Sequence, residues 1–345
     1  MAEIILGGIE GGATHSKVIL CNAKGKRLVE ITGPGTNHWL LGMDECQKRI
    51  YDMVQQAKEE AGLPLDEPLS VLGLSLSGCE QEESNNKLKE DLQSKYPNLS
   101  RQYMVCSDTV GSVAAALPLG GIVVIAGTGS NALLVNPDGS VHRCGGWGCM
   151  LGDEGGAWWV AHKAVKICFD EQDNFVQPPH QTNFVWDAIK RHFNVETRFD
   201  LLDHCYSNFE KSKYAGLAKR LAEGADQGDP LCLWLFAQTG EVLARHITAL
   251  YPKVDKALLE PAGGISVVCV GSVWLSWEHL KPGFIGHLRS EAARPADVRE
   301  LSLLRLTTSM AIGAVYLAAK EISFDLPRDY QENYTVFFHY RREER

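Results

Sequence analysis

The feature that most constrains this chain is a glycine-rich hairpin pattern that occurs twice. Residues 4–20 read as a short apolar run, a turn rich in glycine, and a second apolar run. Residues 122–139 follow the same order. The spacing agrees as well, because Thr14 and Thr128 each stand eight residues before an asparagine and eleven before a glycine of the next turn. We therefore expect two strand–turn–strand segments that repeat one structural plan.

The composition of the two turns favours phosphate binding. Glycine lets a backbone approach a phosphate closely, and successive N–H groups in such a turn form a concavity that binds anions. The threonine in each turn adds a hydroxyl donor, so two such turns could hold a triphosphate. Taken singly, either stretch could be an ordinary tight hairpin. The repetition at matched offsets favours the phosphate interpretation.

Two familiar phosphate-binding motifs are excluded. The chain contains no Gly-x-x-x-x-Gly-Lys-Ser/Thr sequence, so it has no P-loop. Residues 127–132 match the loose Rossmann pattern of glycines, but that motif must open a helix. Here it is followed by Leu133–Val135, which reads as a strand and ends in an Asn-Pro-Asp-Gly turn. The Rossmann interpretation therefore fails on its context.

Length and charge narrow the class of protein. At 345 residues the chain suits two domains better than one, and its 45% hydrophobic content supports full-sized cores. The net charge is −9, and no basic run is present. An acidic chain of this kind lacks the electrostatic footprint that binds nucleic acid or an anionic membrane, so we expect neither as a partner.

The ten cysteines are scattered and mostly lie within apolar runs, as expected for reduced thiols of a cytoplasmic protein. The N-terminus shows no signal peptide, and no apolar run approaches the length of a membrane span. Cys144 and Cys149 form the only close pair, and no second pair of ligands accompanies them, so we expect no metal site in the protein itself.

The order of predicted elements indicates an α/β fold. The first part reads β-β-β-α-β-α-β-α and gives a domain at 1–120; a larger second domain then covers 121–345, with the last roughly 20 residues able to pack on the first. The second domain is mostly helical. We expect helices near 157–170, 183–193, 214–224, 230–250 and 302–320, a strand at 266–270, and a charged, frayed tail from His339 to Arg345.

Asp108 is the candidate general base. It stands at the carboxyl end of a predicted strand and at the start of a helix, where open α/β sheets bind ligands. The alternative is that Asp108 is only a helix N-cap.

Two loops carry further polar candidates. Asp153 and Glu154 stand between glycines, so a ligand could reach their carboxylates without competing bulk, and a carboxylate can accept hydrogen bonds from two vicinal sugar hydroxyls. The loop at residues 33–39 contains Asn37, His38 and Trp39, which are either ligand contacts or a buried anchor of that loop.

Together these features resemble the superfamily of sugar kinases, actin and heat-shock chaperones. Within it, residues 33–39, 127–131 and 144–155 are similar to segments of the N-acetylglucosamine kinases of animals, and the Gly-Gly-Trp-Gly…Gly-Asp-Glu-Gly string is the most specific of these. The match runs from residue 4 to about 320. The resemblance implies two ribonuclease-H-like domains, the actin-like ATPase fold, with a cleft between them. The N-terminal domain at 1–120 would bind sugar and phosphate, and the larger C-terminal domain at 121–345 would bind the nucleotide. It also implies a homodimer.

The resemblance also implies roles for individual residues. Thr14 and Thr128 would hold the phosphates of ATP, and Ala215, Gly216 and Ser272 would line the adenosine side. Asn37, Asp108, the backbone of Gly146, Trp147 and Gly148, and Asp153 would bind the sugar, with Asp108 also acting as base. Mg²⁺ would arrive with the nucleotide. Ala13 departs from the glycine expected in the first turn, a mild change.

The resulting hypothesis is an ATP-dependent kinase that phosphorylates the 6-hydroxyl of N-acetylglucosamine for amino-sugar salvage. Kinases for other sugars, such as glucose, N-acetylmannosamine or muramyl compounds, remain alternatives. A further alternative, from a different class, is a nucleotide-switch ATPase that acts by changing shape. The tryptophan-containing loops around Trp39 and Trp147 argue against that switch.

Overall fold

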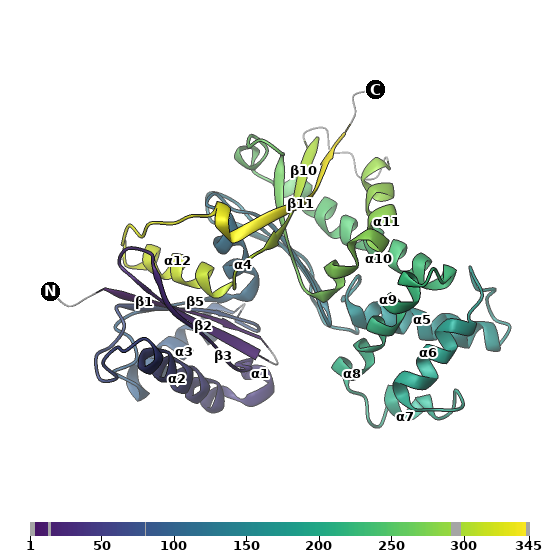
Figure 1. Ribbon diagram of the computed structural model, residues 1–345, viewed down its shortest axis with the longest axis horizontal. Helices are drawn as coiled ribbons and strands as arrows, with labels where there is room; N and C mark the ends of the chain where they lie inside the picture. Colours follow the sequence, from purple (N-terminus) through teal and green to yellow (C-terminus); the bar gives the residue numbers. More distant parts are fainter. Residues whose placement is uncertain (1–3, 13–14, 80, 291–297, 343–345) are drawn as a thin grey trace. The chain divides into compact units, whose positions relative to one another are not determined.

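The computed structural model describes residues 4–12, 15–79, 81–290 and 298–342, which form two compact units (Figure 1). The first unit comprises Met1–Gly121, Pro137–Gly139 and Leu303–Phe338. The second comprises Ile122–Asn136, Ser140–Ser302 and His339–Arg345. The chain thus returns to the first unit after residue 302, before the last roughly 20 residues, which the sequence predicts to be able to pack there. The assignment of sugar and nucleotide roles to domains 1–120 and 121–345 stays a prediction.

The first unit contains a five-stranded mixed sheet in the order β3-β2-β1-β4-β5. Its strands are β1 (Ile5–Gly11), β2 (His15–Asn22), β3 (Arg27–Pro34), β4 (Val71–Leu76) and β5 (Tyr103–Ser107). The three N-terminal strands pair antiparallel, as expected for a hairpin and its third strand, whereas β4 pairs parallel to both β1 and β5. The carboxyl ends of β1, β4 and β5 therefore meet at one edge of the sheet.

Helices cover both faces of this sheet, as Figure 1 shows. They are α1 (His38–Leu41), α2 (Met43–Glu60), α3 (Glu82–Lys95), α4 (Asp108–Ala116) and α12 (Ala311–Glu321), with a short 3₁₀ turn η5 (Gln331–Asn333). The apolar side chains of α2 and α3, such as Ile50, Val54 and Leu88, form one core with the sheet. On the opposite face α12 packs through Ala311 and Val315 against a second core.

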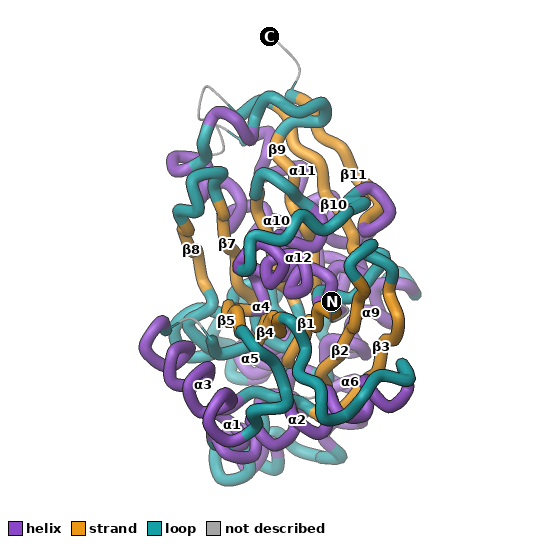
Figure 2. The backbone as a smooth tube through the Cα atoms, turned by 90° about the vertical axis from the view of Figure 1, so that its left-hand side faces the viewer, coloured by secondary structure: helices purple, strands orange, loops and turns teal. Residues whose placement is uncertain are grey.

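The second sheet has six strands in the order β11-β10-β9-β6-β7-β8, of which β7 to β11 are labelled in Figure 2; β10 and β11 contain residues of both units. Its strands are β6 (Gly121–Ala126), β7 (Ser130–Val135), β8 (Val141–Gly145), β9 (Ile265–Val270), β10 (Glu300–Leu306) and β11 (Tyr334–Arg341). Strand β9 runs parallel to β6, and β8 antiparallel to β7. The order β8-β7-β6-β9-β10 repeats the order of the first sheet. The duplicated hairpin seen in the sequence therefore marks a duplicated sheet.

The remaining helices belong to the second unit. They are α5 (Ala157–Gln172), α6 (Asn183–Phe193), α7 (Leu201–Cys205), α8 (Lys211–Ala215), α9 (Leu217–Asp226), α10 (Pro230–Leu250) and α11 (Trp277–Arg289), with 3₁₀ turns η1 (Tyr251–Lys253), η2 (Lys256–Leu258) and η3 (Ser272–Ser276). Buried Trp274 joins η3 to the sheet by donating from Nε1 to the Val124 carbonyl at 3.0 Å. Within the described ranges, no helix combines the length and apolar character needed to cross a membrane.

Three expectations for the second half of the chain are corrected. The helix expected over 302–320 begins only at Ala311, because residues 300–306 form strand β10 in the interior of the sheet. A strand buried on both faces has a nearly continuous apolar sequence, which periodicity cannot distinguish from a helix. The helix expected over 214–224 is divided at Gly216 into α8 and α9.

The third correction concerns the tail, for which the sequence predicts fraying from His339 onward. Instead, β11 extends to Arg341, and His339 Nε2 lies 2.7 Å from Glu300 Oε1. The tail pairs with the sheet despite its charge, because an edge strand can leave its polar side chains in water. Residues 343–345 lie outside the described residues.

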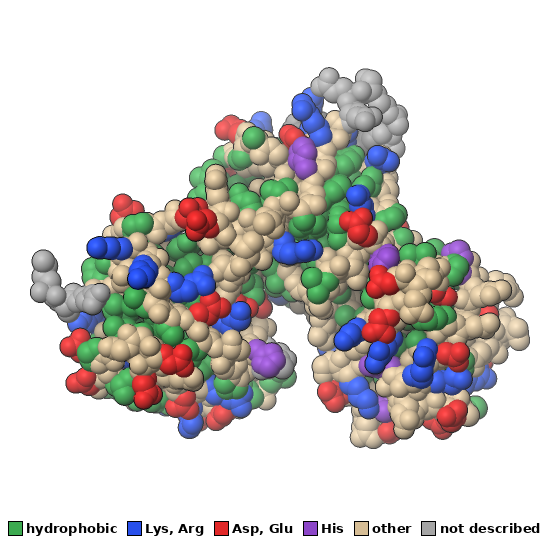
Figure 3. Space-filling view, viewed as in Figure 1, with side chains coloured by type: hydrophobic (Ala, Val, Ile, Leu, Met, Phe, Trp, Pro, Cys, Tyr) green, Lys and Arg blue, Asp and Glu red, His purple; other side chains and the backbone are tan. Residues whose placement is uncertain are grey.

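Charged side chains of both signs are interspersed on the surface drawn in Figure 3. Lys17 and Arg27 both lie close to Glu30, at 3.4 and 2.6 Å, and Lys95 lies 2.6 Å from Asp44. Exposed pairs of this kind contribute little to stability, typically about 0–1 kcal/mol.

Candidate functional site

In the first unit, Asp108 lies where the sequence predicted it, at the junction of β5 and α4. It is the first residue of α4, is half-buried, and directly follows Ser107, the last residue of β5. The N-cap position belongs to Ser107, and Asp108 is the acidic residue of the first turn. The Ser107 carbonyl accepts a hydrogen bond from Ser75 Oγ at 3.2 Å, which ties this junction to β4.

Asn37 is brought to the same edge of the first sheet. Its Oδ1 accepts from the Trp39 backbone N–H at 2.9 Å and so caps α1. Its Nδ2 lies 3.4 Å from Ser77 Oγ, directly after β4. Trp39 anchors the loop through a bond from Nε1 to the Gly78 carbonyl at 3.1 Å, while most of its ring stays exposed. The loop is thus both anchored and open to a ligand.

The turn of the first hairpin is only partly described. Gly12 donates its N–H to the His15 carbonyl at 3.0 Å and accepts from the Thr36 N–H at 3.0 Å. The turn is thereby joined to the loop that carries Asn37. Thr14, the candidate phosphate contact, and Ala13 lie outside the described residues.

In the second unit, the matching turn Gly127-Thr128-Gly129 is held by the start of α5. The carbonyls of Gly127 and Thr128 accept from the N–H groups of Ala157 and Trp158 at 2.8 and 3.0 Å. Within the turn the Gly127 N–H donates to the Gly129 carbonyl at 2.9 Å, and Thr128 is exposed. A Cβ added at Gly127 would meet nothing within 4 Å, so there is open space beside the turn.

Ser272 lies beside this turn. The preceding Gly271 packs so tightly that an added Cβ would lie 2.4 Å from the Ala126 carbonyl oxygen and 2.8 Å from the Gly127 nitrogen. Gly271 has φ +105°, a conformation that glycine adopts without strain. The chain can therefore turn sharply after β9 and present Ser272, the exposed first residue of η3.

Asp153 is the most buried carboxylate of the site, with only 5% of its side chain exposed. Its Oδ1 accepts from the Ser130 N–H at 3.1 Å, immediately after the Gly127–Gly129 turn. Its Oδ2 lies 2.6 Å from Lys211 Nζ, yet it has no well-aligned hydrogen bond among the described residues. The short distance establishes an ion pair, and the poor alignment leaves Oδ2 with capacity to accept a hydrogen bond.

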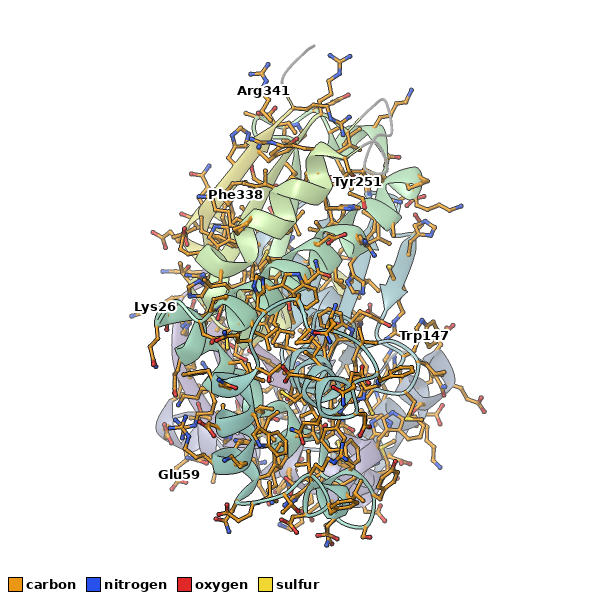
Figure 4. All side chains as sticks on the ribbon, turned by 90° about the vertical axis from the view of Figure 1, so that its right-hand side faces the viewer. Lys26, Glu59, Trp147, Tyr251, Phe338 and Arg341 are labelled. Atoms are coloured by element: carbon orange, nitrogen blue, oxygen red, sulfur yellow. The ribbon has the colours of Figure 1, made fainter. Side chains whose placement is uncertain are left out.

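The Gly146-Trp147-Gly148 segment precedes Asp153 in a small irregular hairpin. Gly146 and Gly148 have φ values of +76° and +85°, which only glycine adopts readily. The Trp147 N–H donates to the Gly152 carbonyl at 3.1 Å, next to Asp153. Trp147, labelled in Figure 4, is 63% exposed. The Arg143 guanidinium lies 5.0 Å from the centroid of its ring.

Helix α10 supports this glycine-rich loop. A Cβ at Gly145 would lie 2.8 Å from His246 Nε2, and one at Gly155 would lie 2.7 Å from Leu243 Cδ2. His246 is buried, and that burial lowers the pKa of its imidazole. A neutral ring is the form that packs against a backbone at low cost. The two ends of the loop thus rest on consecutive turns of one helix.

Ala215 and Gly216 end helix α8, whose first residue is Lys211. Ala215 is buried, and Gly216 leads directly into α9. His192 Nε2 lies 2.8 Å from the Lys213 carbonyl and fixes this end of the helix. Through the Lys211–Asp153 pair, α8 connects the predicted adenosine residues with the predicted sugar carboxylate.

Residues 8–285 match the model of the BadF/BadG/BcrA/BcrD ATPase family. The chain belongs to this family. The glucosamine kinase GspK of Vibrio cholerae is 27% identical over 248 residues, which cover 71% of this chain and 80% of the relative. The N-acetyl-D-glucosamine kinase of Dictyostelium discoideum is 23% identical over 264 residues, which cover 74% of this chain and 81% of that protein.

Solved structures of sugar kinases share the fold. A presumed N-acetylglucosamine kinase from Chromobacterium violaceum superposes with a TM-score of 0.69 at 23% identity, covering 91% of this chain and 99% of that one. A hexokinase of the ROK family from Thermus thermophilus gives a TM-score of 0.57 at 16% identity, covering 93% and 99%. The predicted resemblance and the two-sheet actin-like fold are confirmed.

Sequence reasoning missed several partners of the site residues in this ATPase. Lys211 was missed because it is far from Asp153 in the chain and carries no motif. Ser130, which donates its backbone N–H to Asp153, could have been suspected from its place directly after the glycine turn. Ser77, the partner of Asn37, also follows a predicted strand directly, which is a usable signal.

The described residues also indicate how the metal cation that accompanies ATP would be held. No group of three His, Cys, Asp or Glu side chains in the described part of the chain is arranged to hold a metal ion. Magnesium commonly binds through substrate phosphates and one or two protein carboxylates, so it does not require such a group. The open glycine turn at 127–129 suits a nucleotide that brings its own cation.

Proposed function

We propose that this ATPase-family protein is a kinase that transfers the γ-phosphoryl group of ATP, as its Mg²⁺ complex, to the 6-hydroxyl of N-acetylglucosamine. The observation that carries the proposal is the junction of Asp153 with the Gly127–Gly129 turn. A phosphate-type turn and a buried carboxylate suited to sugar hydroxyls are joined by one backbone hydrogen bond, from Ser130 to Asp153. A protein that only switches shape with its nucleotide has no need of that carboxylate.

Each candidate residue has a role in this reaction. Asp108 would accept the proton of the attacking hydroxyl, and a base at a strand end can be positioned rigidly for this. Thr128 would donate its hydroxyl to a phosphate oxygen, and Mg²⁺ would neutralise charge that develops on the phosphates. Phosphoryl transfer requires mostly positioning and electrostatic stabilisation, so few further side chains are needed.

The remaining assignments concern ligand contacts. Thr14 would contribute to phosphate binding, and Ala215, Gly216 and Ser272 would contact the adenosine. Asn37, Asp153 and the backbone of Gly146, Trp147 and Gly148 would bind the sugar. The names of the Vibrio and Dictyostelium relatives support an amino sugar as substrate. From the family resemblance we also infer a cytoplasmic location and a homodimer. Light scattering on the purified protein tests the homodimer.

The deciding experiment measures ATP consumption by the purified protein with Mg²⁺ and a panel of sugars. N-Acetylglucosamine should accelerate consumption, with one sugar 6-phosphate formed for each ATP used. Glucosamine, glucose, N-acetylmannosamine and N-acetylmuramic acid are the comparison substrates. A higher kcat/KM for one of these would reassign the substrate, while sugar-independent consumption without sugar phosphate would reject the kinase.

A further inference from the structure

The two carboxylate oxygens of Asp153 contact two different segments of the chain, one before Asp153 in the sequence and one after it. Ser130, which binds Oδ1, follows the candidate phosphate contact Thr128 by two residues. Lys211, which pairs with Oδ2, precedes the candidate adenosine contact Ala215 by four residues. Asp153, the proposed sugar contact, is therefore held by two segments that also carry proposed nucleotide contacts.

The Lys211 contact suits a residue that positions Asp153 without replacing its substrate. A buried carboxylate needs a counter-ion, and Nζ supplies one at 2.6 Å. Because the two groups are not aligned as a good hydrogen bond, a lone pair on Oδ2 remains for a sugar hydroxyl. The Lys211 side chain is 35% exposed, so the pair lies at the border of the protein interior and solvent.

Helix α8 is short enough to transmit a displacement from end to end. It has five residues, packs on α5, and is fixed at its far end by His192. Helix α5 in turn donates its first N–H groups to the Gly127–Gly129 turn. A shift of Ala215 therefore cannot be absorbed by a long flexible segment before it reaches Lys211.

We propose that Lys211 is a positioning residue that orients Asp153 for the sugar and couples sugar binding to nucleotide binding through α8. A nucleotide that contacts Ala215 and Gly216 holds α8, and α8 holds Lys211 against Asp153. The sugar then meets a carboxylate that is already oriented. By linkage, the sugar strengthens nucleotide binding by the same factor. This inference rests on the proposed function, in which Asp153 binds the sugar.

The test measures the dissociation constant of N-acetylglucosamine by calorimetry, with and without a saturating non-hydrolysable ATP analogue. In the unmodified protein the analogue should tighten sugar binding at least about fivefold, the lower end of typical coupling. In Lys211→Met the tightening should fall below about twofold, and the sugar dissociation constant should rise about tenfold while kcat changes less. Lys211→Arg keeps the charge and should restore most of both effects.

Lys213→Met is the matched control, because Lys213 lies on the same helix but contacts His204 Nδ1, at 3.4 Å, rather than Asp153. It should keep the coupling of the unmodified protein. If Lys211→Met retains that coupling, or binds sugar more tightly, the inference is overturned. If Lys211→Met does not fold, Lys211→Arg and Lys211→Gln decide the question. Coupling that is lost in Lys211→Arg but kept in Lys211→Gln would also overturn the inference.

Asp153→Ala separates this inference from the function on which it rests. If Asp153→Ala leaves sugar binding unchanged, the proposed sugar contact itself is wrong. If Asp153→Ala weakens sugar binding while Lys211→Met behaves like Lys213→Met, only the role of Lys211 fails. In the double variant Asp153→Asn with Lys211→Met, the two effects on sugar binding should be less than additive, because both changes act on one contact.

Discussion

The two sheets share one strand order, yet their glycines serve different purposes. In the first unit, Gly8 and Gly73 lie under α12, where an added Cβ would be 2.2 and 2.1 Å from the carbonyl oxygens of Ala311 and Ala314. In the second unit, Gly146 and Gly148 have positive φ and shape an irregular loop. At these positions glycine thus provides close helix packing on the first sheet and the backbone shape of a loop in the second unit.

The difference indicates that the two sheets of a duplicated fold can serve different roles. Close packing makes the first sheet a rigid support, and it presents a single candidate for chemistry, Asp108, at a strand end. The loop of the second sheet presents backbone groups and the buried Asp153. We therefore expect changes at Asp108 or under α12 in the first unit to affect turnover or global stability, and changes around the second turn to affect ligand affinity.

Asp108→Asn should have the largest effect. General-base removal typically lowers a rate by about 10² to 10⁴, so turnover should fall by that factor. Sugar affinity should stay within a few-fold, because asparagine preserves the shape and most of the hydrogen bonds. Steady-state assays give kcat, and calorimetry gives the affinity. An Asn variant that keeps more than a tenth of normal turnover would refute the assignment of Asp108 as base.

Asp153→Ala should show the opposite pattern. Each charged hydrogen bond lost to the sugar costs roughly 1.5–3 kcal/mol, so sugar affinity should drop about ten- to a hundredfold or more. The intrinsic affinity for an ATP analogue, measured without sugar, should change little. Equal losses for both ligands, or a loss of thermal stability alone, would show that Asp153 has a structural role.

The sequence of strands and helices along the first part of the chain, and most helices of the second, could be predicted because they depend on local signals. The helices expected near 183–193 and 230–250 are found as α6 and α10, and α10 begins at the Asp229–Pro230 pair, a local start signal. Strand β10 was missed because Leu301, Leu303 and Leu304 are all buried within the sheet. Its identity depends on pairing with segments distant in sequence, which a local pattern does not contain.

The same distinction applies to the site. Asp108 and Asp153 stand out because strand ends and glycine flanks are visible in the sequence. Lys211 reaches Asp153 only because α8 packs on α5, and nothing near Lys211 indicates this. Side chains that carry a motif are predictable, whereas their counter-ions depend on tertiary packing.

Thr128→Val tests the turn of the second hairpin with a smaller expected effect. Valine keeps the shape of threonine but removes its hydroxyl, and one hydrogen bond to a charged group is worth roughly 1.5–3 kcal/mol. The KM for ATP should rise about tenfold or more, while the KM for sugar changes less. Thr128→Ser, which retains the hydroxyl, is the control and should stay near normal. A variant impaired only in sugar binding would contradict the nucleotide role.

The prediction with the smallest expected effects compares an alanine substitution at one glycine of each unit. In Gly73→Ala the new Cβ would meet the Ala314 carbonyl oxygen at 2.1 Å, so α12 must move away from the sheet. Overpacking of this kind costs typically about 1–3 kcal/mol, and Tm should fall while the sugar dissociation constant hardly changes. In Gly148→Ala the new Cβ meets nothing within 4 Å, but φ is +85°.

That conformation costs an alanine about 1 kcal/mol, and the loop can relieve the strain by shifting locally. Because sugar binding would have to restore the original loop, affinity should fall roughly fivefold while Tm stays within a degree or two of normal. Thermal unfolding and sugar titration on the two variants provide the four values needed. If Gly148→Ala lowered Tm as much as Gly73→Ala, or if Gly73→Ala weakened sugar binding equally, glycine would serve packing in both units and the contrast would be lost.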